Sequence, residues 1–78
     1  MTDMQHATRD KIDLRQARRQ VLEDEDRVWR QLVHVEEMRA GGRSVESAEQ
    51  QLETFREELK RARERLRREE SAAAAYRN

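Results

Sequence analysis

The sequence predicts an all-α fold: an antiparallel two-helix coiled-coil hairpin, which we expect to pair with a second copy into a four-helix bundle. Three observations predict this fold. Apolar residues recur every seven positions along both halves of the chain, charged residues make up 44% of it, and its only two glycines are adjacent, at Gly41-Gly42. Apolar heptads indicate coiled-coil helices, and the glycine pair marks a place where the chain can reverse.

The composition limits the chain to a single helical domain over residues 1–78. Of the 78 residues 35% are hydrophobic, and proline and cysteine are both absent. This profile is typical of long helices rather than of a thick globular core, and modules of this size usually gain stability by association. The 17 basic and 17 acidic residues give a formal net charge of zero, so overall charge does not favour nucleic acid or anionic lipid as a partner.

Targeting signals are also missing from the sequence. The N-terminus has neither the basic nor the apolar region of a secretory signal, and no apolar run approaches the ~18–20 residues needed to span a bilayer. The lack of cysteine fits a reducing compartment. We therefore expect a cytoplasmic protein that does not associate with membranes.

The first helix is expected over residues 3–40. Thr2 is a suitable N-cap, Gln5 completes a capping-box pattern, and nothing up to Ala40 breaks a helix. One position of its heptad seam is apolar throughout, whereas the companion position three residues on includes polar side chains. The first position holds Ala7, Leu14, Val21, Val28 and Val35, and the second holds Asp10, Ala17, Asp24, Gln31 and Met38.

Gly41-Gly42 is the expected turn, because a glycine readily takes the left-handed conformation that ends a helix. Ser44 is then a natural N-cap for a second helix over residues 45–76. The seam of this helix is stronger than that of the first, with Glu69 as its one polar residue. It consists of Val45, Ala48, Leu52, Phe55, Leu59, Ala62, Leu66, Glu69, Ala73 and Tyr76.

The short link makes the two helices antiparallel neighbours. From the helical pitch, the numbers of facing residues should sum to about 83. We therefore expect Val35 opposite Ala48 near the turn, and Ala7 near Tyr76 at the far end. The helices could also open at the glycines and swap between two chains, an arrangement that the sequence does not separate from a closed hairpin.

Several apolar residues of the first helix lie off the seam. Between residues 28 and 38 this helix is apolar nearly all round, so it needs cover on two faces, and the second helix can cover only one. Exposed apolar stripes on small proteins mark interaction surfaces, whereas the simpler explanation is that Trp29 wraps over the edge of the hairpin. We expect a non-enzymatic interaction module, an adaptor, assembly subunit or small regulator, that binds itself and another protein. The predicted interface residues are Ile12, Leu22, Trp29, Leu32 and Val33.

Asp24 and Glu25 fall where the seam requires an apolar residue. We expect both carboxylates to lean outward and to pair loosely with basic residues of the second helix, Arg56, Lys60 or Arg63. The alternative is a polar seam residue that fixes the register of the two helices at a cost in stability.

The end of the hairpin away from the turn is rich in arginine. Basic helical surfaces can contact phosphates, so a nucleic-acid-associated or transcription-regulating protein is the alternative function. The simpler explanation is a solvated face with ion pairs four residues apart, such as Glu57 with Arg61 and Glu64 with Arg68. Nucleic acid is the less favoured partner, because no aromatic residue interleaves the arginines and no docking motif is present. The candidate anion contacts are Arg15, Arg18, Arg19, Arg61, Arg65 and Arg68.

The sequence predicts no catalytic, metal or cofactor site. His6 and His34 would lie about 40 Å apart along one helix, so one chain cannot bring both to a single metal ion. No nucleophile motif or phosphate-binding glycine loop is present. Catalytic carboxylates usually need a concave pocket, which two helices cannot form, so we expect neither an enzyme nor a small-molecule substrate.

Overall fold

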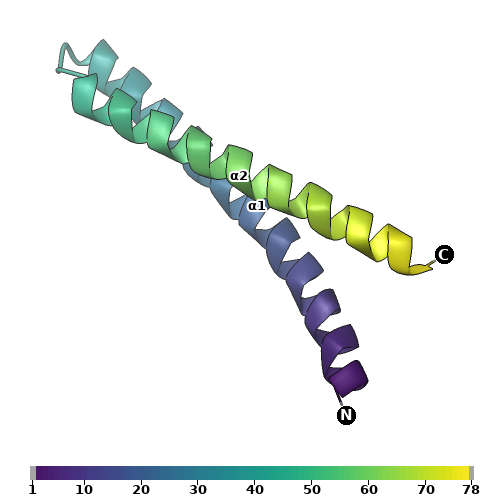
Figure 1. Ribbon diagram of the computed structural model, residues 1–78. Coiled ribbons are helices and arrows are strands. Elements are labelled where there is room, and N and C mark those ends of the chain that lie inside the picture. Colours follow the sequence, from purple (N-terminus) through teal and green to yellow (C-terminus); the bar gives the residue numbers. More distant parts are fainter. Residues whose placement is uncertain (1, 78) are drawn as a thin grey trace.

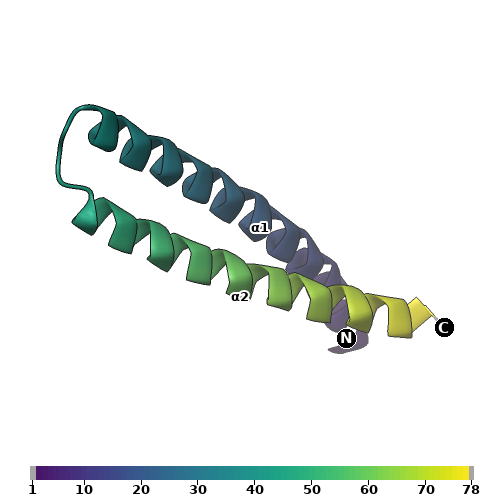
Figure 2. The same ribbon diagram turned by 90° about the horizontal axis from the view of Figure 1, so that it is seen from above.

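The computed structural model describes the backbone of residues 2–77 and the side chains of residues 13–76. Helix α1 runs over Thr2–Ala40 and helix α2 over Glu46–Arg77. The two helices pack against each other in an antiparallel hairpin (Figures 1 and 2), and the molecule measures 59 × 19 × 14 Å. The helical hairpin predicted from the heptads is therefore confirmed.

The end of α1 depends on one glycine of the pair. Gly42 has a φ of 71°, in the left-handed region that favours glycine. Its N–H donates to the carbonyl of Arg39 at 3.0 Å, and the N–H of Arg43 donates to the carbonyl of Met38 at 2.9 Å. These two bonds form a Schellman motif with Gly42 at the C′ position. A Cβ at Gly41 would meet no atom closer than 3.5 Å, so only Gly42 requires glycine.

Helix α2 begins one residue later than expected. Its first helical hydrogen bond runs from the N–H of Glu49 to the carbonyl of Val45 at 2.8 Å. Val45 therefore stands at the N-cap position in place of Ser44, although valine is a poor capping residue. The side chain of Val45 is half-buried, because it is the first apolar residue of the α2 seam. Packing at this position thus overrides the capping preference.

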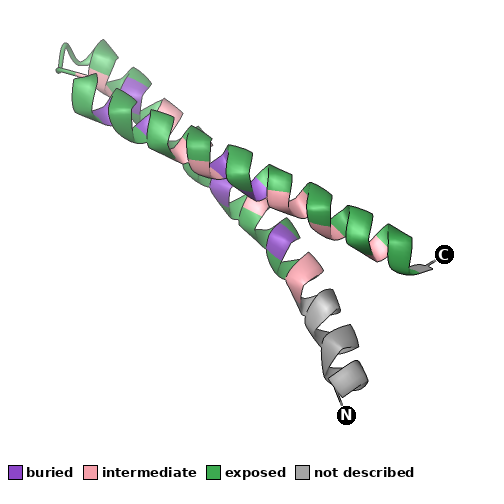
Figure 3. Cartoon of the chain, in the orientation of Figure 1, coloured by how far each residue is buried: buried purple, intermediate pink, exposed green. Residues whose placement is uncertain are grey.

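The buried residues lie along the line where the two helices face each other (Figure 3), and they form a thin core. It follows the predicted heptads, with spacings that alternate between three and four residues. Half of its buried apolar residues are alanines, which allow the two helices to approach closely. The buried apolar residues are Ala17 and Val35 on α1 and Ala48, Leu52, Leu59 and Ala62 on α2.

The helices separate at the end away from the turn (Figure 1). Among the described side chains, Ala17 and Ala62 are the last buried residues in that direction, and Tyr76 is 82% exposed. The predicted packing of Tyr76 in the seam is therefore wrong, and the side chain of its expected partner Ala7 lies outside the described residues. The reason is that Glu69 occupies a seam position and the alanines after it bury too little surface to hold the helices together.

Candidate interaction surface

Three apolar side chains of α1 are exposed on the side away from α2, and we call this strip the outer face of α1. Leu22 is 67% exposed, Trp29 63% and Val33 37%. The simpler explanation, that Trp29 wraps over the edge of the hairpin, is wrong because most of its surface is in solvent. Leu32 is half-buried, and the side chain of Ile12 lies outside the described residues.

The outer face is exposed because α2 covers only the opposite side of α1. Val35 is buried and Val28 is half-buried against α2. Trp29 follows Val28 by one residue and Val33 precedes Val35 by two, which places both on the other side of the helix. Successive residues of a helix are rotated by about 100°, so one partner helix cannot reach both sets. The hairpin thus leaves large apolar side chains in solvent next to its core.

Asp24 is buried in the seam, contrary to our expectation that it leans outward. It is 3% exposed, whereas Glu25 is exposed and pairs with Arg63 at 3.1 Å, one of the predicted cross-hairpin pairs. The reason is the heptad position of Asp24, which points at α2, and its short side chain, which cannot reach past the seam to solvent. Glu25 is one residue further round the helix, so its side chain points away from the seam and pairs across the hairpin as predicted.

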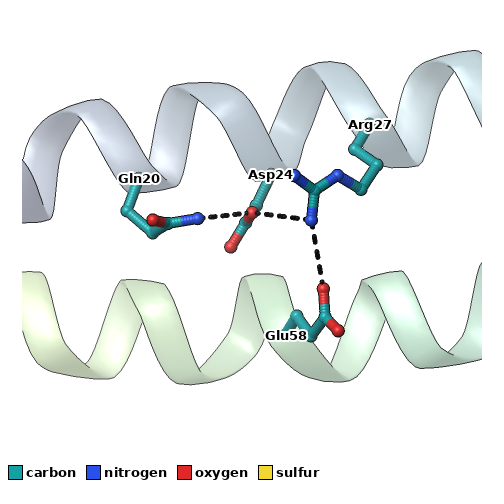
Figure 4. A network of polar contacts seen from close by, with 4 residues as sticks. All are labelled: Gln20, Asp24, Arg27 and Glu58. Carbon is teal, nitrogen blue, oxygen red and sulfur yellow. Dashed lines mark hydrogen bonds and ion pairs between the residues drawn. The ribbon is translucent and has the colours of Figure 1, made fainter.

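A polar network satisfies the buried carboxylate (Figure 4). Gln20 Nε2 donates to Asp24 Oδ1 at 2.9 Å, and Arg27 Nη1 lies 3.8 Å from the same oxygen. Arg27 also reaches across to α2, where its Nη1 lies 3.3 Å from Glu58 Oε2 and its guanidinium carbon lies 5.5 Å from the centre of the Phe55 ring. Among the described side chains, no buried nitrogen or oxygen lacks a hydrogen-bond partner.

Gln31 is a second polar residue of the α1 seam, one heptad after Asp24. Its Nε2 donates to the backbone carbonyl of Ala48 at 2.9 Å, a bond that the sequence did not reveal. A slip of α2 along α1 would remove this acceptor and would also separate Arg27 from Glu58. These contacts support the alternative reading of the seam, in which polar residues specify the register.

Replacing Asp24 with leucine is expected to raise the free energy of unfolding by about 1–3 kcal/mol. The change removes the cost of burying a carboxylate, and its partners Gln20 and Arg27 are exposed, so they stay solvated. Urea unfolding followed by circular dichroism measures this change. Asp24→Asn is the matched control: it keeps an acceptor for Gln20 without the charge, and its effect should stay within about 1 kcal/mol. A clear loss of stability in Asp24→Leu would show that the network is a net stabiliser of the hairpin.

The six candidate anion contacts share one part of the hairpin but not one face. Cross-hairpin ion pairs identify its two sides: Arg63 with Glu25 on the first, and Arg27 with Glu58 on the second. Arg18 precedes Glu25 by one heptad, so it belongs to the first side. Arg65 follows Glu58 by one heptad, so it belongs to the second side.

None of these six arginines forms an ion pair within the described part of the chain. Arg65 is half-buried and the other five are exposed. None of the six is within 4.0 Å of a carboxylate among the described side chains, so the expected pairs Glu57–Arg61 and Glu64–Arg68 are not formed. Their positive charge is therefore available to solvent, although it is spread around the hairpin.

The described part of the chain was also compared with the requirements of a metal site and of a membrane-spanning helix. No group of three or more His, Cys, Asp or Glu residues within it could hold a metal ion. Neither of its helices combines the length and the apolar character that crossing a membrane requires. Comparison of the chain with protein-family models, with curated proteins and with solved structures finds no match.

Proposed function

We propose that this chain is a non-enzymatic protein–protein interaction module that associates with itself through the outer face of α1. The observation that carries the proposal is the 63% exposure of Trp29 between two other exposed apolar residues, Leu22 and Val33. Its cellular role is that of an adaptor, an assembly subunit or a small regulator that also binds another protein. We also propose that the protein is cytoplasmic. Its lack of cysteine fits a reducing compartment, in which disulfides are rare.

The chemistry of the outer face supports this proposal. Tryptophan contributes strongly to binding when it lies at the centre of an interface, because it buries a large apolar surface with few rotatable bonds. Small soluble proteins rarely leave such residues clustered in solvent without a partner. The outer face also belongs to a long rigid helix, so binding requires little rearrangement of the backbone.

The solution mass of the wild-type chain tests the proposal. Light scattering over a range of concentrations should give twice the 9.4 kDa mass of one chain at micromolar concentration, with a shift toward one chain on dilution. A folded monomer at all these concentrations would contradict self-association but would leave the hairpin itself unaffected.

Binding of a polyanion such as nucleic acid is a second candidate function. One observation favours it: the six arginines have no ion-pair partner among the described side chains. The wide spread of these residues makes a flexible or single-stranded ligand a better fit than a rigid duplex, because such a ligand can follow the surface of the hairpin.

For the second candidate, Arg61→Glu combined with Arg65→Glu is expected to weaken binding of a single-stranded oligonucleotide by at least about tenfold and to reduce its salt dependence. Fluorescence anisotropy at two salt concentrations measures both effects. The matched control reverses two arginines near the turn, Arg39→Glu and Arg43→Glu, and should have a smaller effect. Self-association through the outer face should survive the first double substitution. An unmeasurable affinity of the wild-type chain at low salt would eliminate this candidate.

A further inference from the structure

The outer face is the middle of a longer heptad stripe on α1. Its members are spaced alternately by four and three residues, and all of them are exposed. The stripe begins with two arginines, carries its large apolar residues and Asp26 in the middle, and has Glu36 toward the turn. Its members are Arg15, Arg19, Leu22, Asp26, Trp29, Val33, Glu36 and Ala40. A second stripe at heptad spacing that carries apolar residues can form a second coiled-coil contact, and charged members of the stripe can set its direction and register.

We infer that a second copy of this chain covers the stripe with its own α1, antiparallel, in the register that sets Arg19 of each copy opposite Glu36 of the other. Facing residue numbers then sum to about 55, and Leu22 of each copy meets Val33 of the other. The inference rests on the proposed self-association and defines its geometry. Because the stripe is rotated by about 150° from the seam, the four helices would form a layer with the two α1 helices in the middle, in place of the four-helix bundle expected from the sequence.

Charge selects the antiparallel direction. A parallel pair would set Arg19 against Arg19 and Glu36 against Glu36, with repulsion at both ends of the contact. The antiparallel pair replaces these with two attractive contacts between opposite charges. The antiparallel pair also brings Glu23 of each copy beside Arg30 of the other, at the edge of the stripe. This adds a second contact between opposite charges.

Charge also selects the register. A shift by one heptad in one direction would join Trp29 to Val33 but would set Asp26 against Glu36 on both sides of the contact. A shift in the other direction would set Leu22 against Asp26 and Val33 against Arg15, so that Leu22 and Val33 would no longer meet an apolar residue. Like charges that face each other, or a charge placed on an apolar residue, weaken a coiled-coil contact. The register with Arg19 opposite Glu36 avoids the first problem and retains an apolar pair.

Two features of this register oppose the contact, and both are compensated within the hairpin. Arg18 comes beside Arg39 of the other copy, but Arg39 already lies 3.7 Å from Glu49 of its own chain. Asp26 faces the tryptophan of the other copy, but it forms an ion pair with Arg30 at 2.9 Å. The carboxylate therefore approaches the aromatic ring together with its counter-charge, which lowers the cost of removing it from water.

Charge reversal tests this register. Arg19→Glu and Glu36→Arg should each raise the dissociation constant of the homodimer about tenfold at low salt, because each creates two like-charge contacts in the dimer. The double variant should return to within about threefold of wild type. An equimolar mixture of the two single variants should associate as tightly as wild type, because the heterodimer restores attraction at both ends. Arg61→Glu on α2 is the matched control and should leave association unchanged.

Sedimentation equilibrium measures these constants, and circular dichroism checks that each variant keeps its helices. If the single variants weaken association but the double variant does not restore it, this register is wrong. If the single variants have no effect while Trp29→Ala still separates the copies, the register is again wrong but the proposed function stands. A wild-type chain that remains monomeric would reject both together.

Discussion

Trp29→Ala is expected to separate the self-associated protein into single hairpins that keep their helices. Removal of a central tryptophan from an interface typically costs about 2 kcal/mol or more, which corresponds to a dissociation constant raised about 30-fold. The hairpin should be unaffected, because Trp29 is 63% exposed and contributes little to the seam. Light scattering over a concentration series measures the mass, and far-ultraviolet circular dichroism measures the helix content.

Tyr76→Ala is the matched control for this prediction. Tyr76 is also an aromatic residue of a helix and is 82% exposed, but it lies outside the outer face. Its replacement should change neither the mass nor the helix content. If Trp29→Ala left the mass at two chains, the copies would be held together in another way, for example by helices swapped between chains at Gly41-Gly42.

Leu59→Ala is expected to lower the free energy of unfolding of the hairpin by about 2–4 kcal/mol. Leu59 is 8% exposed and is one of only two leucines in the buried core, so its removal leaves a cavity that the thin seam cannot close. A hairpin of this size has little stability in reserve. We therefore expect a large loss of helix content at room temperature, measured by circular dichroism and by thermal unfolding.

The matched control is the same substitution at an exposed leucine, Leu22→Ala. Both variants should be made in the Trp29→Ala background, so that association does not add to the measured stability. In that background Leu22→Ala should change the free energy of unfolding by less than about 0.5 kcal/mol, because Leu22 is 67% exposed. Equal effects of the two substitutions would mean that the seam does not hold the hairpin together.

Much of the fold follows from local rules that the sequence displays. The seven-residue period identifies Val35, Leu52 and Leu59 as core residues, because a helix has a fixed number of residues per turn. The glycine pair locates the turn, since the left-handed conformation of Gly42 is strained for other residues. The exposure of Trp29 and Val33 follows from the same period, because both lie on the side of α1 that α2 does not reach.

Other features depend on atoms that lie far apart in the sequence. The burial of Asp24 depends on α2, which packs over its position on α1, whereas its carboxylate is satisfied by Gln20 and Arg27 of its own helix. The bond from Gln31 to Ala48 requires a backbone carbonyl of the other helix at the correct height. Neither arrangement could be read from a heptad pattern, which describes one helix at a time.

The sequence by itself determined the two helices, their seam, the glycine at the turn and the existence of a second apolar side on α1. Each of these depends on the period of a single helix or on the conformation of a single residue. Only the tertiary structure decided that Asp24 is buried, that the arginines lie on different sides, and that the helices separate toward Tyr76. These features depend on the distance and rotation between two helices, which the packing of both seams sets together.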